Sequence, residues 1–281
     1  MTRCVIAIAL LVGAQPVFGQ QSESQSGAAP SFSPVTWERL LNAADEPENW
    51  LTYNGTYSSQ RYSQLDQIDR GNVDELEMRW MLQNQVFGAW QSNPIVVDGI
   101  MYITQRPNDV MAVDAVTGRV FWVYEHENDE AARVCCGANN RGVAILGDKL
   151  FMGTLDAHVV AIDATNGQPL WDIEIGDPSL GYSVTMAPLV VKDKVLVGVG
   201  GGEYGIRGFV AAYDADTGEE VWKTYTIPAP GEPGHETWDD DDWEHGGAPI
   251  WITGSYDAEL DLTYWGVGNP GPDWNAAQRP G

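Results

Sequence analysis

Short stretches of alternating apolar and polar residues recur along the chain from residue 94 onward. Residues 94–99 form the first stretch, and residues 100–103 follow directly after Gly99, where a turn is expected. Alternation with a period of two is typical of a β-strand with one buried face, and Gly at the boundaries favours turns. A third stretch ends at Asp114 and a fourth at Trp122. The pattern therefore predicts an all-β chain of short strands.

One motif repeats at a nearly constant interval. The pattern Ala-x-Asp-Ala-x-x-Gly-x-x-x-Trp occurs three times and ends at Trp122, Trp171 and Trp222, which are 49 and then 51 residues apart. A period near 50 with four strand-like stretches per repeat is typical of a β-propeller blade. We expect the Asp and Gly to form the turn between the last two strands, and the Trp to pack between blades.

The region before these repeats predicts one further unit. Residues 50–80 begin and end with Trp50 and Trp80 and contain similar short stretches, which brings the count to about four blades by Gly281. A closed propeller has roughly four to eight blades. The last residues, 279–281, contain no sign of a closing strand. We therefore expect a partial propeller domain over residues 35–281.

The amino-terminal residues predict export. Arg3 precedes an apolar run, residues 4–14, and Val17-Phe18-Gly19 resembles a cleavage site, so residues 1–19 are interpreted as a signal peptide. A run of about a dozen residues is short of the ~20 that a membrane-spanning helix needs. Residues 20–34 are rich in Gln, Ser, Gly and Ala and are expected to form a flexible leader. The mature chain should contain no integral membrane segment.

The charge excludes one class of partner. The 281 residues contain 15 Lys and Arg against 40 Asp and Glu, which gives a net charge of −25. Such a surface repels polyanions, so nucleic acid is not expected as a partner. A hydrophobic fraction of 43% with 12 Trp excludes wholesale disorder.

Two adjacent cysteines remain once the signal peptide is removed. Cys135 and Cys136 should be oxidised in an exported protein. Their Cα atoms, ~3.8 Å apart across a trans peptide, lie closer than in ordinary disulfides, so a bond between them would close a small strained ring. Such a ring suggests a functional site, because it constrains almost none of the unfolded chain. Two buried free thiols are the alternative.

Three segments carry a family resemblance. Residues 135–142 (CCGANNRG), 201–208 (GGEYGIRG) and 265–272 (WGVGNPGP), together with the Trp-ended repeats, closely resemble the quinoprotein alcohol dehydrogenases, which use pyrroloquinoline quinone (PQQ). The resemblance implies an eight-bladed propeller of which the chain holds about the first half. It further implies a periplasmic enzyme that oxidises a primary alcohol to an aldehyde and passes electrons to a c-type cytochrome.

The resemblance also implies a cofactor site. It places a Cys135–Cys136 disulfide against one face of the quinone and Trp251 against the other, where the two would orient a flat ring and exclude water. Arg141 matches an arginine near the quinone oxygens, and a permanent cation there stabilises growing negative charge. Thr185 matches a hydroxyl donor to a PQQ carboxylate, and Gly201 and Gly202 match backbone N–H donors.

A metal ion belongs to the implied site. Glu203 and Asn269 match the protein ligands of a Ca²⁺ that also contacts the quinone, and oxygen donors suit this hard cation. A lanthanide replaces Ca²⁺ in some relatives. The ion would polarise a quinone carbonyl while an aspartate base removes the alcohol proton. That aspartate is expected beyond Gly281, so no catalytic residue is assigned within the chain.

Some features depart from the family pattern. Gln91 replaces a Glu, and Gly200 replaces a Ser, of some relatives near the cofactor carboxylates. The acidic run 239–242 could suggest a second metal site, but consecutive carboxylates point in alternate directions and repel one another, so a solvated loop near the substrate entrance is expected. The alternative function is a cofactor-free propeller that serves as a binding or assembly scaffold, which would have no use for the cysteine pair or for Glu203 with Asn269.

Overall fold

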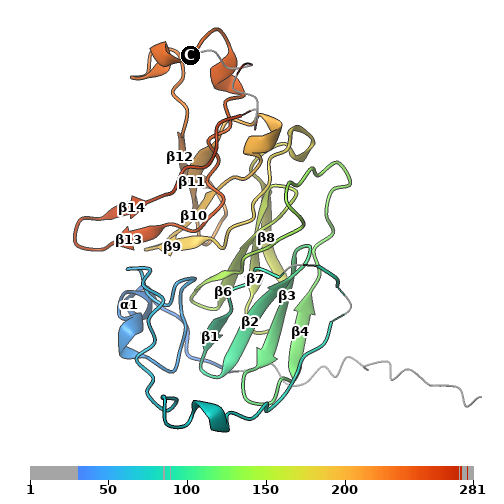
Figure 1. Cartoon of the computed structure of the whole chain (residues 1–281), viewed down its shortest axis with the longest axis vertical. Coiled ribbons are helices and arrows are strands. Elements are labelled where there is room, and N and C mark those ends of the chain that lie inside the picture. Colours follow the sequence, from blue (N-terminus) through green and yellow to red (C-terminus); the bar gives the residue numbers. More distant parts are fainter. Residues whose placement is uncertain (1–30, 85, 89, 272, 274–276, 278–281) are drawn as a thin grey trace, which may run out of the picture.

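The computed structural model of the chain describes residues 31–281 except for residues 85, 89, 272, 274–276 and 278–281. The predicted signal peptide and residues 20–30 of the predicted leader therefore lie outside the described residues. Within the described part, antiparallel sheets dominate and helices are short (Figure 1). No helix in this part combines the length and the apolar character that crossing a bilayer requires.

Three four-stranded sheets follow one another along the chain (Figure 1). The first blade contains β1 (Ile95–Val97), β2 (Ile100–Gln105), β3 (Asp109–Asp114) and β4 (Val120–Tyr124). The second blade contains β5 (Ala144–Leu146), β6 (Lys149–Gly153), β7 (His158–Asp163) and β8 (Pro169–Glu174). The third contains β9 (Leu189–Val191), β10 (Lys194–Gly198), β11 (Phe209–Asp214) and β12 (Glu220–Tyr225). Strands pair antiparallel in chain order within each blade, as the alternation predicts.

Shorter elements complete the described fold. A hairpin of β13 (Ser255–Asp257) and β14 (Leu262–Tyr264) follows the third blade. The α-helix α1 (Trp37–Leu41) precedes the first blade. Single 3₁₀ turns occur in the connections, and they are η1 (Ala43–Asp45), η2 (Val73–Glu75), η3 (Pro178–Leu180), η4 (Gly202–Tyr204), η5 (His235–Thr237) and η6 (Asp242–Glu244).

The repeated motif joins neighbouring blades. In the second blade, the Asp163 carboxylate accepts a hydrogen bond from the backbone N–H of Thr165, and the N–H of Gly167 donates to the Asp163 carbonyl. The indole of Trp122 in the first blade packs on Gly167 and donates to the Ala164 carbonyl at 3.2 Å. Trp171 makes the same bond to the Ala215 carbonyl of the third blade, at 3.3 Å. The predicted roles of the Asp and the Gly are confirmed, and so is the packing of Trp122 and Trp171 between blades. Trp222 is 40% exposed and has no such contact among the described residues.

The predicted amino-terminal unit is not a blade of its own. Within the described residues 50–90, the regular structure is limited to η2 and an isolated bridge from Trp50 to Val96. Trp80 nevertheless donates to the Ala115 carbonyl at 3.1 Å and packs on Gly118, as Trp122 does one blade later. The Trp was recognised correctly, but the neighbouring stretches have no partner strands. The interpretation of the amino-terminal unit as a blade is therefore wrong, and the described residues form three complete blades and one hairpin.

The segment before the first blade crosses all three blades. It pairs with the second blade through a Val35–Gly147 bridge and with the first through Trp50 and Val96. The Tyr57 hydroxyl donates to the Val190 carbonyl of the third blade at 2.7 Å. These three contacts tie the segment to all three sheets and fix the sheets relative to one another.

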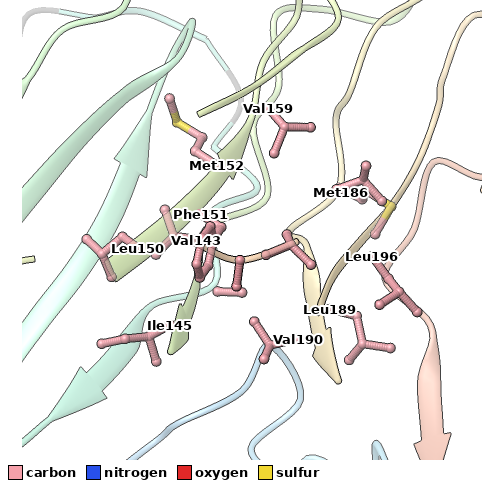
Figure 2. Packing of buried hydrophobic residues seen from close by; sticks show 14 of the residues in the cluster. Val143, Ile145, Leu150, Phe151, Met152, Val159, Met186, Leu189, Val190 and Leu196 are labelled. Atoms are coloured by element: carbon pink, nitrogen blue, oxygen red, sulfur yellow. The ribbon is translucent and has the colours of Figure 1, made fainter. Parts of the chain in front are cut away.

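Apolar side chains fill the space between the blades. Figure 2 shows Ile145 and Phe151 of the second blade on one side, and Leu189 and Leu196 of the third blade on the other. Most residues of β6, β7 and β10 are buried, whereas β8 and β12 are largely exposed. The outer strands therefore face solvent, and the inner strands hold the connecting loops in fixed positions.

Replacing Gly167 by alanine is expected to destabilise the chain more than replacing Gly99. Both glycines have a positive φ, of 77° and 84°, so each substitution should cost about 1–2 kcal/mol of backbone energy. At Gly167 a Cβ would also lie 2.6 Å from the Trp122 ring, whereas nothing lies within 4 Å at Gly99. We expect an additional loss of about 1–3 kcal/mol for Gly167→Ala in urea unfolding. Equal losses would show that the Trp122 contact does not join the blades.

Candidate functional site

A cleft of about 460 Å³ opens where the loops of successive blades meet. This volume lies within the range of about 300–1,000 Å³ that is usual for small-molecule sites. Its walls come from residues 134–141 between β4 and β5, 183–185 before β9, 200–203 after β10, and 249–252 before β13. The predicted site residues that line it are Cys135, Cys136, Arg141, Thr185, Gly201, Glu203, Trp251 and Asn269. Residues far apart in sequence thus meet in one cavity.

The cysteine pair forms one wall of the cleft. Cys135 and Cys136 are bonded to each other, with sulfurs 2.02 Å apart, so the alternative of two free thiols is wrong. The loop around the pair is held from both sides. The Asn139 side chain donates to the Cys136 carbonyl at 3.0 Å, and the Arg106 guanidinium donates to the Ala138 carbonyl at 2.8 Å.

Buried asparagines fix the end of this loop. Asn140 donates through its amide to the Asn108 side chain at 3.2 Å and to the Gly153 carbonyl at 2.9 Å. Its carbonyl oxygen accepts from the N–H of Gly142 at 3.1 Å. Asn108 is fully buried and also accepts from the N–H of Leu155. The bonds to Asn108 and Gly153 tie Asn140 to neighbouring segments, and the bond from Gly142 closes a local turn around Arg141. Arg141, which lies between Asn140 and Gly142, therefore has a defined position.

Arg141 is the cation of the cleft. Its backbone N–H and its Nη1 both donate to the Thr185 carbonyl, at 3.2 and 3.0 Å. Its Cζ lies 5.0 Å from the centroid of the Trp251 ring. Burial lowers the pKa of Arg141 from its ordinary value, but a guanidinium stays protonated in proteins. The cleft therefore holds a permanent positive charge.

Trp251 offers a large apolar surface to the cleft. The side chain is a cleft wall, and the residue is 42% exposed. Its backbone carbonyl accepts a hydrogen bond from the Thr185 hydroxyl at 3.3 Å. Its Nε1 lies 3.0 Å from the position that a Cβ on Gly268 would take. The segment before β9 that contains Thr185, together with the glycine at position 268, locates the indole.

Gly201 lines the cleft beside Glu203, and its neighbour Gly202 packs behind the cleft wall. Gly201 has a φ of 107°, and a Cβ there would lie 2.0 Å from the Gly181 carbonyl oxygen, so no side chain fits. The backbone N–H of Gly201 donates to no acceptor among the described residues, and it is available to a ligand. Gly202 does not line the cleft; it is buried behind it, against Pro249.

Two unpartnered oxygen donors lie in the same cleft. Glu203 is part of η4, and one of its carboxylate oxygens lies within 4.8 Å of both sulfurs of the cysteine pair. Asn269 is fixed by its backbone, because its carbonyl accepts from the N–H of Ala248 at 2.8 Å. Within the described part of the chain, no donor bonds to the Glu203 carboxylate or to Asn269 Oδ1. Disulfide sulfurs are poor ligands for hard cations, so these two oxygens are the natural protein donors to a metal here.

The structure adds cleft residues that the sequence did not single out. Ser183 and Asn139 are both buried and both line the cleft, beside Pro249 and Ile252. Ser183 could have been recognised, because it lies two residues before Thr185 and shares its face in an extended segment. Gln91 and Gly200, the two departures from the family pattern, also line the cleft.

The acidic run lies elsewhere. Asp239, Asp240 and Asp241 are exposed, and Asp242 begins η6. None of the four lines the cleft. Among the residues with described positions, the run contains no cluster of side chains spaced to hold a metal. An exposed loop is therefore confirmed.

Comparison with known proteins identifies close relatives. Residues 50–281 match the PQQ family described as glucose/ethanol/alcohol dehydrogenase, beta-propeller domain. The chain is 43% identical to quinohemoprotein alcohol dehydrogenase ADH IIB of Pseudomonas putida over 82% of its length and 35% of that protein. It is 40% identical to the lanthanide-dependent methanol dehydrogenase of Methylacidiphilum fumariolicum, over 87% of the chain and 44% of that protein.

Solved structures give the same result. A europium-containing methanol dehydrogenase superposes with a TM-score of 0.81 and 39% identity over 86% of the chain and 46% of that protein. The quinohemoprotein alcohol dehydrogenase ADHIIG of Pseudomonas putida gives a TM-score of 0.82 and 39% identity, over 89% of the chain and 39% of that protein. The chain spans between 35 and 46% of the length of these curated relatives.

Proposed function

The chain belongs to the PQQ family of alcohol dehydrogenases with a β-propeller domain, and from this premise we propose that it binds PQQ and a metal ion for alcohol oxidation. The proposed reaction converts a primary alcohol to an aldehyde in the periplasm, with a c-type cytochrome as the electron acceptor. One observation carries the proposal. The disulfide, Arg141, Trp251, Glu203 and Asn269 line a single cleft.

The chemistry of the cleft fits a flat, anionic ring. The disulfide and the exposed indole of Trp251 supply apolar surface for the ring, and Arg141 supplies a positive charge for anionic oxygens. The free N–H of Gly201 adds a polar donor, and the Thr185 hydroxyl lines the cleft while it donates to the Trp251 carbonyl at 3.3 Å. A ligand with an aromatic core and carboxylates at its edge matches this distribution, as PQQ does.

Glu203 and Asn269 are proposed to hold the metal. Their oxygens have no donor among the described residues, and one carboxylate plus one amide leaves several coordination positions for cofactor oxygens. We propose Ca²⁺ as the ion, with a lanthanide as the alternative, since both take oxygen ligands. One relative is named as lanthanide-dependent, and one solved structure is named as europium-containing.

The chemistry that PQQ supplies when bound is two-electron oxidation, in which an alcohol loses a hydride and a proton. Arg141 then contributes a fixed cation beside the developing negative charge, in a place where burial strengthens the interaction. Trp251 and the disulfide exclude water from the faces of the ring. The disulfide also supports an oxidising compartment, because such bonds persist outside the cytosol.

Titration of the full chain with PQQ tests this proposal. With Ca²⁺ or La³⁺ present, we expect saturable quenching of tryptophan fluorescence at one PQQ per chain, and loss of this binding on addition of a chelator. A Trp251→Phe variant should show weaker quenching, because its indole lies in the cleft. Trp222 lies outside the cleft and provides the matched Trp222→Phe control. Absence of binding with either metal would favour the cofactor-free scaffold.

A further inference from the structure

Residues 183–185 form an extended segment along the cleft. The N–H of Gly200 donates to the Ser183 carbonyl at 2.7 Å, and the N–H of Val184 donates to the Thr154 carbonyl at the same distance. Val184 is fully buried, and a Cβ on Gly153 would lie 2.1 Å from its side chain. Because alternate residues of an extended chain point to opposite sides, Ser183 and Thr185 both face the cleft that they line.

The two hydroxyls differ in their bonding. The Thr185 hydroxyl donates to the Trp251 carbonyl at 3.3 Å. Ser183 is only 3% exposed, yet its hydroxyl forms no hydrogen bond with any residue that the structure describes. Ser183 lines the cleft, and its Oγ is not one of the fully buried polar atoms that lack a partner, so the hydroxyl is open to a ligand that accepts a hydrogen bond.

Gly200 leaves the room that Ser183 needs. A Cβ at position 200 would lie 3.0 Å from the Ser183 Oγ, which is closer than most real contacts. The side chains of positions 183 and 200 therefore compete for one space at the edge of the cleft. In this chain that space is occupied by the Ser183 hydroxyl, next to the free N–H of Gly201.

We propose that Ser183 is a cofactor-binding residue whose hydroxyl donates a hydrogen bond to a carboxylate of the bound quinone. The acceptor is anionic because the neighbouring groups, the Gly201 N–H and Arg141, are a donor and a cation. This inference rests on the proposed function. It adds a polar contact from the segment that connects the second blade to the third. It also gives a role to the glycine at position 200, which leaves room for the Ser183 hydroxyl.

Replacing Ser183 by alanine should lower the affinity for PQQ about tenfold in the fluorescence titration, because a hydrogen bond to a charged group is lost. Ser183→Cys keeps the volume of the side chain but is a weak donor, so it should lose a similar factor. Ser179→Ala is the matched control, since Ser179 is bonded to Asp177 and lies outside the cleft. Circular dichroism of each variant verifies the fold.

The double variant S183A/G200S gives the sharper test. Gly200 has no positive φ, so serine fits its backbone, and removing the Ser183 Oγ relieves the 3.0 Å contact. We expect the double variant to recover most of the lost affinity, while Gly200→Ser alone binds PQQ less well than wild type. Wild-type affinity in Ser183→Ala would overturn this inference and leave the proposed function intact. Failure of the wild type itself to bind PQQ would refute the proposed function and, with it, this inference.

Discussion

In a protein that contains this chain within a complete propeller, replacing Glu203 by glutamine should lower the proposed metal-dependent alcohol oxidation by about a thousandfold. Glutamine has nearly the same shape, so the cleft and η4 should keep their structure. What changes is the charge: the carboxylate that lies within 4.8 Å of the disulfide sulfurs becomes a neutral amide. Hard cations bind weakly to a site without a carboxylate, and the metal that the proposed chemistry needs would be lost.

The measurement is dye-coupled oxidation of a primary alcohol with PQQ and either Ca²⁺ or La³⁺, together with metal-dependent PQQ binding. The control is the double variant Asp240→Asn/Asp241→Asn, which removes two carboxylates from the exposed acidic run and should leave activity unchanged. Full activity in Glu203→Gln, or loss of activity in the control, would place the metal elsewhere.

The repeat allowed most of the fold to be predicted. Three copies of one motif specify three turns, and the tryptophans of the first two copies, Trp122 and Trp171, donate the same hydrogen bond to the next blade. Trp222, which ends the third copy, is 40% exposed and makes no such bond among the described residues. The amino-terminal unit could not be counted correctly from pattern alone. Trp80 has the contacts of a blade-ending Trp, but a strand exists only where another strand pairs with it. Local sequence does not contain that information.

The site was predictable to the extent that its residues lie in distinctive motifs. The cysteine pair and Glu203 stand in unusual sequences, and the cleft brings them together. Ser183 and Asn139 have no such signal, because their roles depend on the loops opposite them. Gly202 shows the reverse case: it belongs to a matching motif, yet it packs behind the cleft wall, against Pro249. Motifs indicate chemistry, whereas exposure to a cavity depends on packing.

The loop that carries the disulfide is fixed near its start by a buried, hydrogen-bonded pair of side chains, His126 and Asp156. His126 donates to both carboxylate oxygens of Asp156 at 3.1 Å, and the two side chains are only 5% and 3% exposed. The Thr154 hydroxyl and the N–H of Asp129 also donate to this carboxylate. Asp156 lies in the turn between β6 and β7, so the pair joins the second blade to the loop from β4. The position of Cys135 therefore depends on charge as well as on apolar packing.

Replacing Asp156 by asparagine should lower the free energy of unfolding by about 3 kcal/mol, because one partner of a buried, hydrogen-bonded pair is lost. Asp172→Asn is the matched control. Its bond to His158 is also short, at 2.6 Å, but the two side chains are 40% and 28% exposed, so it should lose less than about 1 kcal/mol. Urea unfolding of both variants measures the difference, and equal losses would contradict a special role for the buried pair.

The pH dependence provides the independent check. Burial opposes ionisation of Asp156, but hydrogen bonds from His126, Thr154 and Asp129 outweigh it and hold the pKa of this carboxyl well below its usual range. As the pH falls below about 4, the unfolded chain therefore takes up a proton before the native chain does. The stabilisation by Asp156 is complete above that pH and declines below it. The difference in unfolding free energy between wild type and Asp156→Asn should therefore shrink from pH 5 toward pH 2, whereas a constant difference would show that charge on Asp156 does not hold the loop.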